Sequence, residues 1–151
     1  MEHFKRFKMP NLLTKNSVLI LNTEQGILTL LSERSILQQQ LLSPSETSLI
    51  AKLLEMYPEY CPNEVLFSVH TGEDVEKSRQ QLLNASKEQT MHEMTKSLRA
   101  VLARCRKKLH PFGIEIVTLL GRGCSLEPLN HKAKTDMTSR GMLDNKSEML
   151  T

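Results

Sequence analysis

The side chains best suited to chemistry in this sequence are six cations gathered between residues 92 and 108. They are Lys96, Arg99, Arg104, Arg106, Lys107 and Lys108, and Glu93 is the acidic residue among them. Six positive charges against one negative give this segment a net charge of +5, so the rest of a chain of net charge +3 totals −2. Cations concentrated in one stretch are suited to contact phosphates, and the chemistry indicated is the binding of a nucleic acid.

The element that must position these cations is an amphipathic helix over residues 91–109. Its apolar residues recur at steps of three and four and therefore share one face: Met91, Met94, Leu98, Val101, Leu102, Cys105 and Leu109. The opposite face carries Ala100 and Ala103 among long cations, and small residues there permit close approach to a groove lined by phosphates and bases. The alternative is a core helix with a solvated basic face, which is the more common case for such a helix taken alone.

A strand and a tight turn follow this helix. Pro111 ends the helix, and the β-branched run Ile114–Leu120 predicts a strand. Gly121 and Gly123 bracket a turn, after which a short returning strand is predicted up to residue 126. A basic helix followed by a hairpin is the order of elements in a winged helix, in which the recognition helix precedes the wing.

These residues resemble the DNA-binding effector domain of the OmpR/PhoB family of bacterial response regulators. The family's recognition helix ends in a Leu-Arg-Lys-x-Leu-like stretch, matched here by Cys105–Leu109, and its wing returns through a Gly-x-Gly-Tyr-like turn, matched by Gly121–Cys124. The resemblance covers roughly residues 17–126. It implies an α+β fold, a winged helix-turn-helix with a small N-terminal antiparallel sheet, a three-helix core and a C-terminal β-hairpin wing.

The residues before the basic helix also match the family's first helix. Leu42–Glu46 looks like the opening of that helix, and its local chemistry predicts one independently, with Ser43 as N-cap, Pro44 at the first helical position and Glu46 completing a capping box. The apolar residues that then share one face are Leu49, Ile50, Leu53, Leu54 and Tyr57. Pro58 ends this helix.

The remaining elements follow the order found in the family. Two apolar runs, 17–21 and 26–31, fit the small antiparallel sheet that precedes its helices, and 35–38 is a candidate third strand. A short second helix is predicted over residues 63–69. The charged segment 72–89 occupies the position of the loop through which such domains touch RNA polymerase, and its residues leave a short helix and a mobile loop both open.

The length of 151 residues predicts one modest domain with flexible ends. We expect a flexible N-terminal segment over 1–16, a winged-helix domain over 17–127 and a disordered tail over 128–151. Because this leaves no room for the family's receiver domain, we expect a standalone regulator. No apolar run approaches 18 residues, so no contact with a membrane is expected. Three cysteines without CxxC spacing suit a reducing cytoplasm, with Cys105 as a small buried side chain.

Catalytic and metal sites are not indicated by the sequence. The histidines at 3, 70, 92, 110 and 131 are scattered, and the sequence has no glycine-rich phosphate loop, nucleophile elbow or HExxH pattern. A zinc site is disfavoured because the usual paired ligands are absent. We therefore expect no enzymatic activity, no cofactor and no metal.

The sequence accordingly predicts a cytoplasmic bacterial regulator of transcription that binds double-stranded DNA sequence-specifically. Helix 91–109 is expected in the major groove and wing 114–126 at the minor groove. The resemblance implies that DNA contacts come from Lys96, Ser97, Ala100, Arg104 and Arg106 on the helix and from Arg122 on the wing. The basic face of the helix adds Lys107 and Lys108 as expected phosphate contacts. A homodimer on DNA is a further expectation. Two alternatives remain open: a protein-interaction module that has the winged-helix shape and binds another regulator, and a nonspecific DNA-compacting protein.

Overall fold

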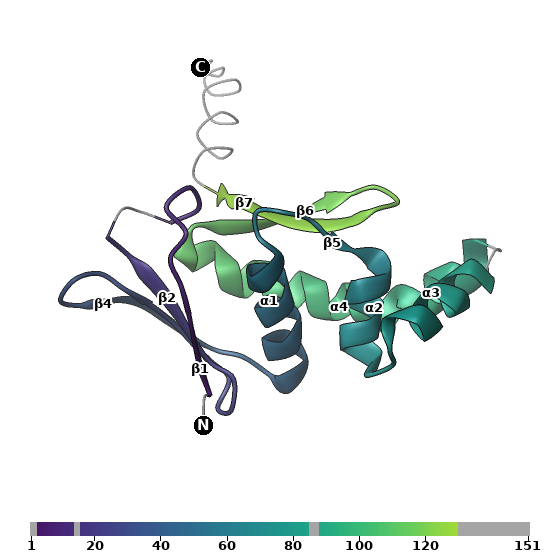
Figure 1. Ribbon diagram of the computed structural model, residues 1–151, viewed down its shortest axis with the longest axis horizontal. Helices are drawn as coiled ribbons and strands as arrows, with labels where there is room; N and C mark the ends of the chain where they lie inside the picture. The colour runs from purple at the N-terminus through teal and green to yellow at the C-terminus, as the bar shows by residue number, and fades with distance from the viewer. Residues whose placement is uncertain (1–2, 14–15, 85–87, 130–151) are drawn as a thin grey trace, which may run out of the picture.

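Four consecutive antiparallel strands open the fold in the computed structural model, which describes residues 3–13, 16–84 and 88–129 (Figure 1). They pair in sequence order and are β1 (Phe4–Phe7), β2 (Val18–Asn22), β3 (Ile27–Leu31) and β4 (Ile36–Leu41). Every second residue of β2 and β3 is buried, which is the alternation expected of strands with one face on the core. The predicted strands 17–21 and 26–31 are therefore confirmed, and the candidate third strand is β4.

The N-terminal residues belong to this sheet, so the prediction of a flexible segment over 1–16 is wrong for residues 3–13. Strand β1 pairs with β2 from Phe4↔Asn22 to Phe7↔Leu19. Lys5 donates a hydrogen bond to the Glu55 carboxylate on the first helix. The turn after β1 also buries three apolar side chains in the core, those of Met9, Leu12 and Leu13. Because the pairing partners are distant in sequence, this short cationic stretch carries no local sign of a strand and is predicted as a flexible segment.

Helix α1 (Pro44–Met56) begins as its capping residues predict. The Ser43 hydroxyl accepts from the Glu46 amide at 3.2 Å, and the Glu46 carboxylate accepts from the Ser43 amide at 2.8 Å, which together form the capping box. The apolar face of α1 is buried at Leu49, Ile50, Leu53 and Leu54. Tyr57, partly buried against the core, is the C-cap residue immediately before Pro58.

Three further helices follow, so the described residues hold four α-helices where a three-helix core was predicted. They are α2 (Asn63–Thr71), α3 (Val75–Asn84) and α4 (Glu88–Leu109). Helix α2 confirms the predicted second helix, and α4 confirms the basic helix with an earlier start. Helix α3 occupies most of segment 72–89, so the loop interpretation of that segment is wrong. The Asp74 carboxylate accepts from the Lys77 amide at 2.7 Å and so caps the start of α3.

A second, three-stranded sheet closes the fold. After the short 3₁₀ turn His110–Phe112, strands β6 (Ile114–Leu119) and β7 (Gly123–Pro128) form the predicted hairpin. The two-residue strand β5 (Cys61–Pro62) pairs with β7, which gives the strand order β5-β7-β6. The backbones of β5 and β7 are so close that a Cβ at Gly123 would stand 1.9 Å from the Cys61 carbonyl oxygen.

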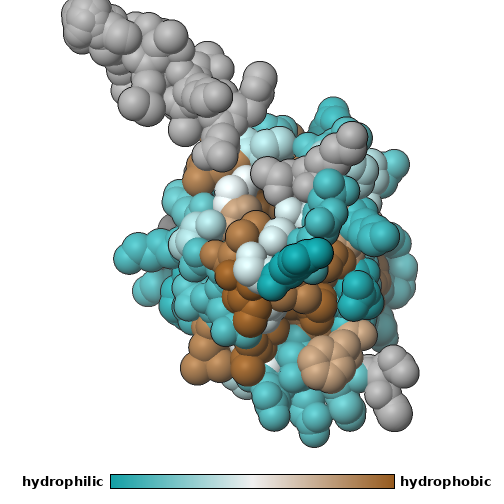
Figure 2. All heavy atoms as spheres, turned by 90° about the vertical axis from the view of Figure 1, so that its left-hand side faces the viewer, coloured by the Kyte–Doolittle hydropathy of each residue, from teal (hydrophilic) through white to brown (hydrophobic). Residues whose placement is uncertain are grey.

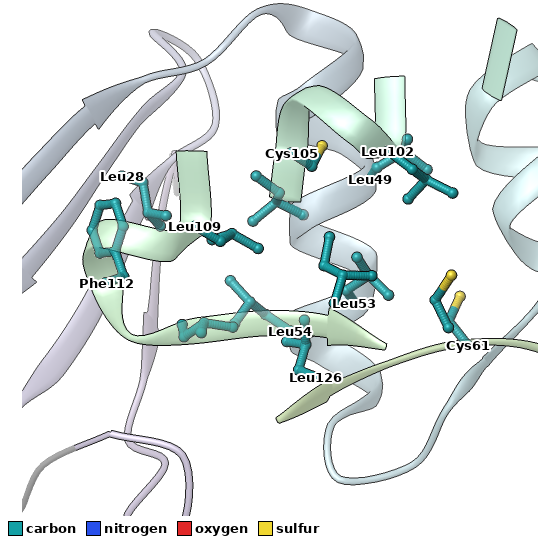
Figure 3. Close-up of a cluster of buried hydrophobic side chains, with 14 of the residues drawn as sticks. Leu28, Leu49, Leu53, Leu54, Cys61, Leu102, Cys105, Leu109, Phe112 and Leu126 are labelled. Atoms are coloured by element: carbon teal, nitrogen blue, oxygen red, sulfur yellow. The ribbon is translucent and has the colours of Figure 1, made fainter. Parts of the chain in front are cut away.

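One hydrophobic core joins the two sheets and the helices, and the fold class is α+β. Leu28 of the first sheet lies beside Leu109, at the end of α4, and Phe112 of the 3₁₀ turn, while Leu53 and Leu54 of α1 lie near the hairpin (Figure 3). All three cysteines are buried, and burial raises the pKa of both Cys61 and Cys105 to about 12. The small buried role expected for Cys105 is thus confirmed. From residue 130 onward, the predicted tail 128–151 lies outside the described residues.

Candidate nucleic-acid interface

The outward side of α4 carries an exposed line of two lysines and two alanines, here called the basic ridge. Its members are Lys96, Ala100, Ala103 and Lys107, and all four are exposed. Steps of four, three and four residues place them on one face, because an α-helix repeats every 3.6 residues. The opposite face buries Leu98, Val101, Leu102, Cys105 and Leu109 against the core. The periodicity of the sequence therefore predicted this part of the site.

Two other cations of α4 face the start of α1 and bind one buried carboxylate there. The side chain of Glu46 is only 2% exposed. Its Oε2 accepts from Arg104 Nε at 3.1 Å, and its Oε1 accepts from Lys108 Nζ at 2.8 Å. The same lysine also donates to the Leu41 carbonyl oxygen at 3.0 Å. We refer to Glu46, Arg104 and Lys108 as the Glu46 triad.

Electrostatics keep the centre of the Glu46 triad ionised. Burial would raise the pKa of Glu46, but hydrogen bonds from Lys108, the Ser43 amide and Arg104 outweigh it and hold the pKa below its usual value. One carboxylate therefore completes the capping box of α1 and fixes two side chains of α4. No local sequence signal reveals this arrangement, since Arg104 is 58 residues from Glu46.

The Glu46 triad gives Arg104 and Lys108 different degrees of access. The Arg104 side chain stays 54% exposed, and its Nη groups donate no hydrogen bond to another of the described residues. Lys108 is only 31% exposed, and its ammonium bonds two acceptors of the protein. A carboxylate on Nε orients a guanidinium without covering its other edge. Arg104 can therefore still meet a ligand, whereas Lys108 serves mainly to join α4 to α1 and β4.

Arg106, on the other side of α4, holds the hairpin. Its Nε donates to the Ile116 carbonyl oxygen at 3.2 Å, and its Nη2 donates to the Thr118 hydroxyl. The side chain is partly buried along β6. Arg106 was predicted as a DNA contact through the family resemblance, and here its donors connect the basic helix to the strand that leads to the hairpin turn.

Ser97 connects α4 to α2. Its hydroxyl lies 3.0 Å from Nε2 of His70, in the last turn of α2. Ser97 is exposed, so this contact lies at the surface, one residue from the basic ridge. The sequence did not anticipate a role for His70, whose position in the last turn of a helix carries no distinguishing pattern.

The hairpin turn presents Arg122 and an unusually exposed leucine. Arg122 is exposed, and its backbone is fixed because its amide donates to the Leu119 carbonyl and its carbonyl accepts from the Asn63 amide, both at 2.8 Å. Leu120, in the same turn, is 97% exposed. Gly121 between them has a φ of 75°, a left-handed conformation that favours glycine. Sequence reasoning assigned Leu120 to the strand and so missed it as a surface residue.

The structure thus sorts the eight predicted contact residues into two groups. Those that are exposed on α4 or the hairpin turn are Lys96, Ser97, Ala100, Arg104, Lys107 and Arg122. Arg106 and Lys108 are partly buried and bind other parts of the fold. The hairpin turn lies beside α4, since Gly121 lines the same cavity as Arg99 and Arg106.

No family model matches this chain, and a search of curated proteins finds no match. Within residues 3–13, 16–84 and 88–129, no group of three or more histidine, cysteine, aspartate or glutamate side chains is arranged to hold a metal ion. Likewise, no helix among those residues is both long and apolar enough to cross a membrane.

Proposed function

We propose that this chain is a sequence-specific regulator of transcription that binds double-stranded DNA as a winged helix. In this proposal α4 is the recognition helix in the major groove, and the β6–β7 hairpin is the wing at the minor groove. The observation that carries the proposal is the basic ridge, where Ala100 and Ala103 lie between the exposed cations Lys96 and Lys107. Small residues between cations let a helix approach bases while its lysines reach phosphates. A regulator of this kind must be in the same compartment as the DNA, so the proposal places the protein in the cytoplasm of a bacterium.

The contacts within the protein support a division of labour among the predicted residues. Lys96 and Lys107 would neutralise phosphates, while Arg104, oriented by Glu46, would direct its outer guanidinium edge toward a base. Arg106 and Lys108 would act indirectly, by fixing the hairpin and the helix relative to each other. Arg122 would enter the minor groove, with the exposed Leu120 beside it as an apolar contact.

Salt dependence of binding tests the basic ridge. A duplex is first selected from bacterial genomic fragments with the whole protein, and its dissociation constant is then measured by fluorescence anisotropy at several salt concentrations. Replacing both Lys96 and Lys107 with alanine should lower the slope of log affinity against log salt by about 1.8, since each neutralised phosphate contributes about 0.9. The substitutions are at exposed positions and should leave the thermal melt nearly unchanged.

Lys52→Ala is the matched control for this experiment. Lys52 is a lysine of α1 whose side chain is 35% exposed and pairs with Glu55, away from the basic ridge. Its loss should leave the slope unchanged. An equal slope for the wild type and the double variant would exclude the ridge as a DNA contact. Equal affinity for selected and random duplexes would instead favour a nonspecific DNA-compacting protein.

A second candidate function, a protein-interaction module that binds another regulator, is favoured by apolar residues on the first sheet. Viewed from the sheet side, hydrophobic residues gather among hydrophilic ones (Figure 2). The exposed apolar side chains of this sheet are Phe4, Ile36, Leu37 and Leu41, each more than half exposed. Such groups mark contact surfaces when they gather on one face. The same face is available to a second copy of the chain, and RNA polymerase remains a proposed partner for the region of α3.

Two substitutions distinguish DNA binding from the protein-interaction function, one that reverses a charge and one that makes an apolar residue polar. Arg122→Glu at the hairpin turn should weaken DNA binding at least about 10-fold, through lost attraction and added repulsion. Leu37→Gln on the sheet should leave DNA binding by the monomer unchanged, because it lies on a different element. If Arg122→Glu leaves DNA affinity intact and only Leu37→Gln abolishes capture of a regulator in pull-downs, the interaction module is the correct function.

A further inference from the structure

A cavity of about 560 Å³ lies where α2, α3, α4 and the hairpin meet. Each helix contributes two apolar side chains to its wall: Leu66 and Phe67, Leu82 and Leu83, Leu98 and Leu102. Sites for small molecules are of this size and are likewise lined mainly by hydrophobic groups. One of these side chains, Leu83, is 65% exposed, so apolar surface is open to solvent at the edge of the cavity.

Among the described residues, the charged side chains in the wall of this cavity are those of Arg79, Arg99, Arg106 and Glu64. Carboxylates already offset the charge of Arg79, with Glu76 at 2.7 Å and Glu64 at 4.0 Å. Within the described part of the chain, Arg106 donates to a carbonyl and a hydroxyl, which are neutral and do not offset its positive charge. Arg99 lies two helical turns before Arg106 on the same side of α4. Arg106 therefore gives the α4 wall a positive charge beside the apolar side chains.

We propose that this cavity binds a small amphipathic carboxylate, specifically a free fatty acid. Its acyl chain would lie among the leucines of α2, α3 and α4, and its carboxylate would face Arg99 and Arg106. The described side chains of the apolar part are five leucines and one aromatic ring, which suit a flexible chain better than a flat ring system. The cavity is beside the basic ridge, not on it, so the proposal goes beyond DNA binding and holds whether or not the chain binds DNA.

Calorimetry on the whole protein without DNA tests the proposal, with decanoate as the probe, below its micelle concentration. Two compounds with the same tail isolate the contribution of the charge: 1-decanol, which is neutral, and decyltrimethylammonium, which is cationic. Decanoate should bind saturably at one site, and each comparison compound should bind at least about 10-fold more weakly. Benzoate, as a short aromatic carboxylate, should also bind more weakly. Tighter binding of benzoate would overturn the assignment to a fatty acid.

Two matched variants locate the site. Leu83→Glu places a negative charge at the cavity edge and should reduce decanoate affinity at least about 10-fold. Val75→Glu makes the same kind of change at another exposed apolar residue of α3 that does not line the cavity, and it should have no effect. Arg99→Gln should weaken decanoate binding and leave decanol binding unchanged.

Three outcomes would overturn the proposal. Absence of saturable decanoate binding would show that the cavity takes no fatty acid. Equal effects of Leu83→Glu and Val75→Glu would place any binding elsewhere. Equal affinity for decanoate and decanol would exclude recognition of the carboxylate. None of these measurements involves DNA, so failure here is distinguishable from failure of the proposed regulatory function.

Discussion

At the scale of single residues, Glu46 has the most connections of the side chains in the candidate site. It caps α1 through the Ser43 amide and holds Arg104 and Lys108 of α4. Taking a carboxylate out of water is costly, and the cost is offset here because three donors converge on its two oxygens. The orientation of Arg104 toward solvent therefore depends on a residue at the start of another helix.

Glu46→Gln should destabilise the protein by about 1–3 kcal/mol at neutral pH, because glutamine keeps an acceptor for the Ser43 amide but leaves two cations without their charge partner. The folded-state pKa of Glu46 lies below its ordinary value of 4.5, so its contribution is fully present above pH 4.5 and is lost as the pH falls through the folded-state pKa. The difference between the wild type and the variant in urea unfolding should therefore narrow in acid.

Glu59→Gln, at an exposed position, is the control and should change stability by less than about 0.5 kcal/mol. A difference between the wild type and Glu46→Gln that stays constant as the pH falls below 4.5 would contradict the role assigned to the charge.

At the scale of elements, local chemistry predicted some segments well and missed others. Helix α1 was predicted because Ser43, Pro44 and Glu46 signal its start within four residues of sequence. Strand β5 has only two residues, too few for any periodicity, and exists because Cys61 pairs with Cys124. Strand β1 is largely exposed and likewise depends on a distant partner, β2. Elements defined by tertiary pairing carry little signal of their own.

The same distinction applies to the candidate site. The basic ridge follows from helical periodicity, so the sequence predicted Lys96, Ala100 and Lys107 as surface residues. The contacts of Arg104 and Lys108 with Glu46, and of Arg106 with β6, depend on how α4 packs against other elements. Charge alone does not distinguish a cation that faces solvent from one that joins two parts of a fold.

The close approach of β5 and β7 leads to a prediction about Gly123. Gly123→Ala should destabilise the fold by about 1–3 kcal/mol or more, because its Cβ would overlap the Cys61 carbonyl oxygen and force the strands apart. Hydrogen exchange at the Asn63 amide, which donates to the Arg122 carbonyl, should become faster. In Gly121→Ala the new Cβ would have no atom within 4 Å, so the only expected effect is strain from the positive φ of this residue. Exchange at the Asn63 amide should stay nearly unchanged. Unchanged exchange in Gly123→Ala would refute this account.

At the scale of the whole molecule, the first sheet and its N-terminal strand are part of the core that supports α4. Deleting residues 1–13 should lower the stability by about 3 kcal/mol or more and the melting temperature by roughly 10 °C, because Met9, Leu12 and Leu13 are buried and β2 loses its neighbour. Lys8→Ala, an exposed change in the same segment, should have little effect. If the deletion variant has the same melting temperature as the wild type, this segment does not contribute to the core and the interpretation as a flexible segment would be right.

The two sheets differ in the order in which the chain supplies their strands. The first sheet is a simple meander, so all its partners are present once the ribosome has released residue 41. The second sheet needs residue 61 to meet residue 124, which is available only near the end of the described chain. During synthesis the first sheet can thus form while α1 and α2 still await their closing hairpin. The apolar face of α1 that packs on the hairpin is exposed for that interval, which makes this stage the one at which a nascent chain most needs protection from aggregation.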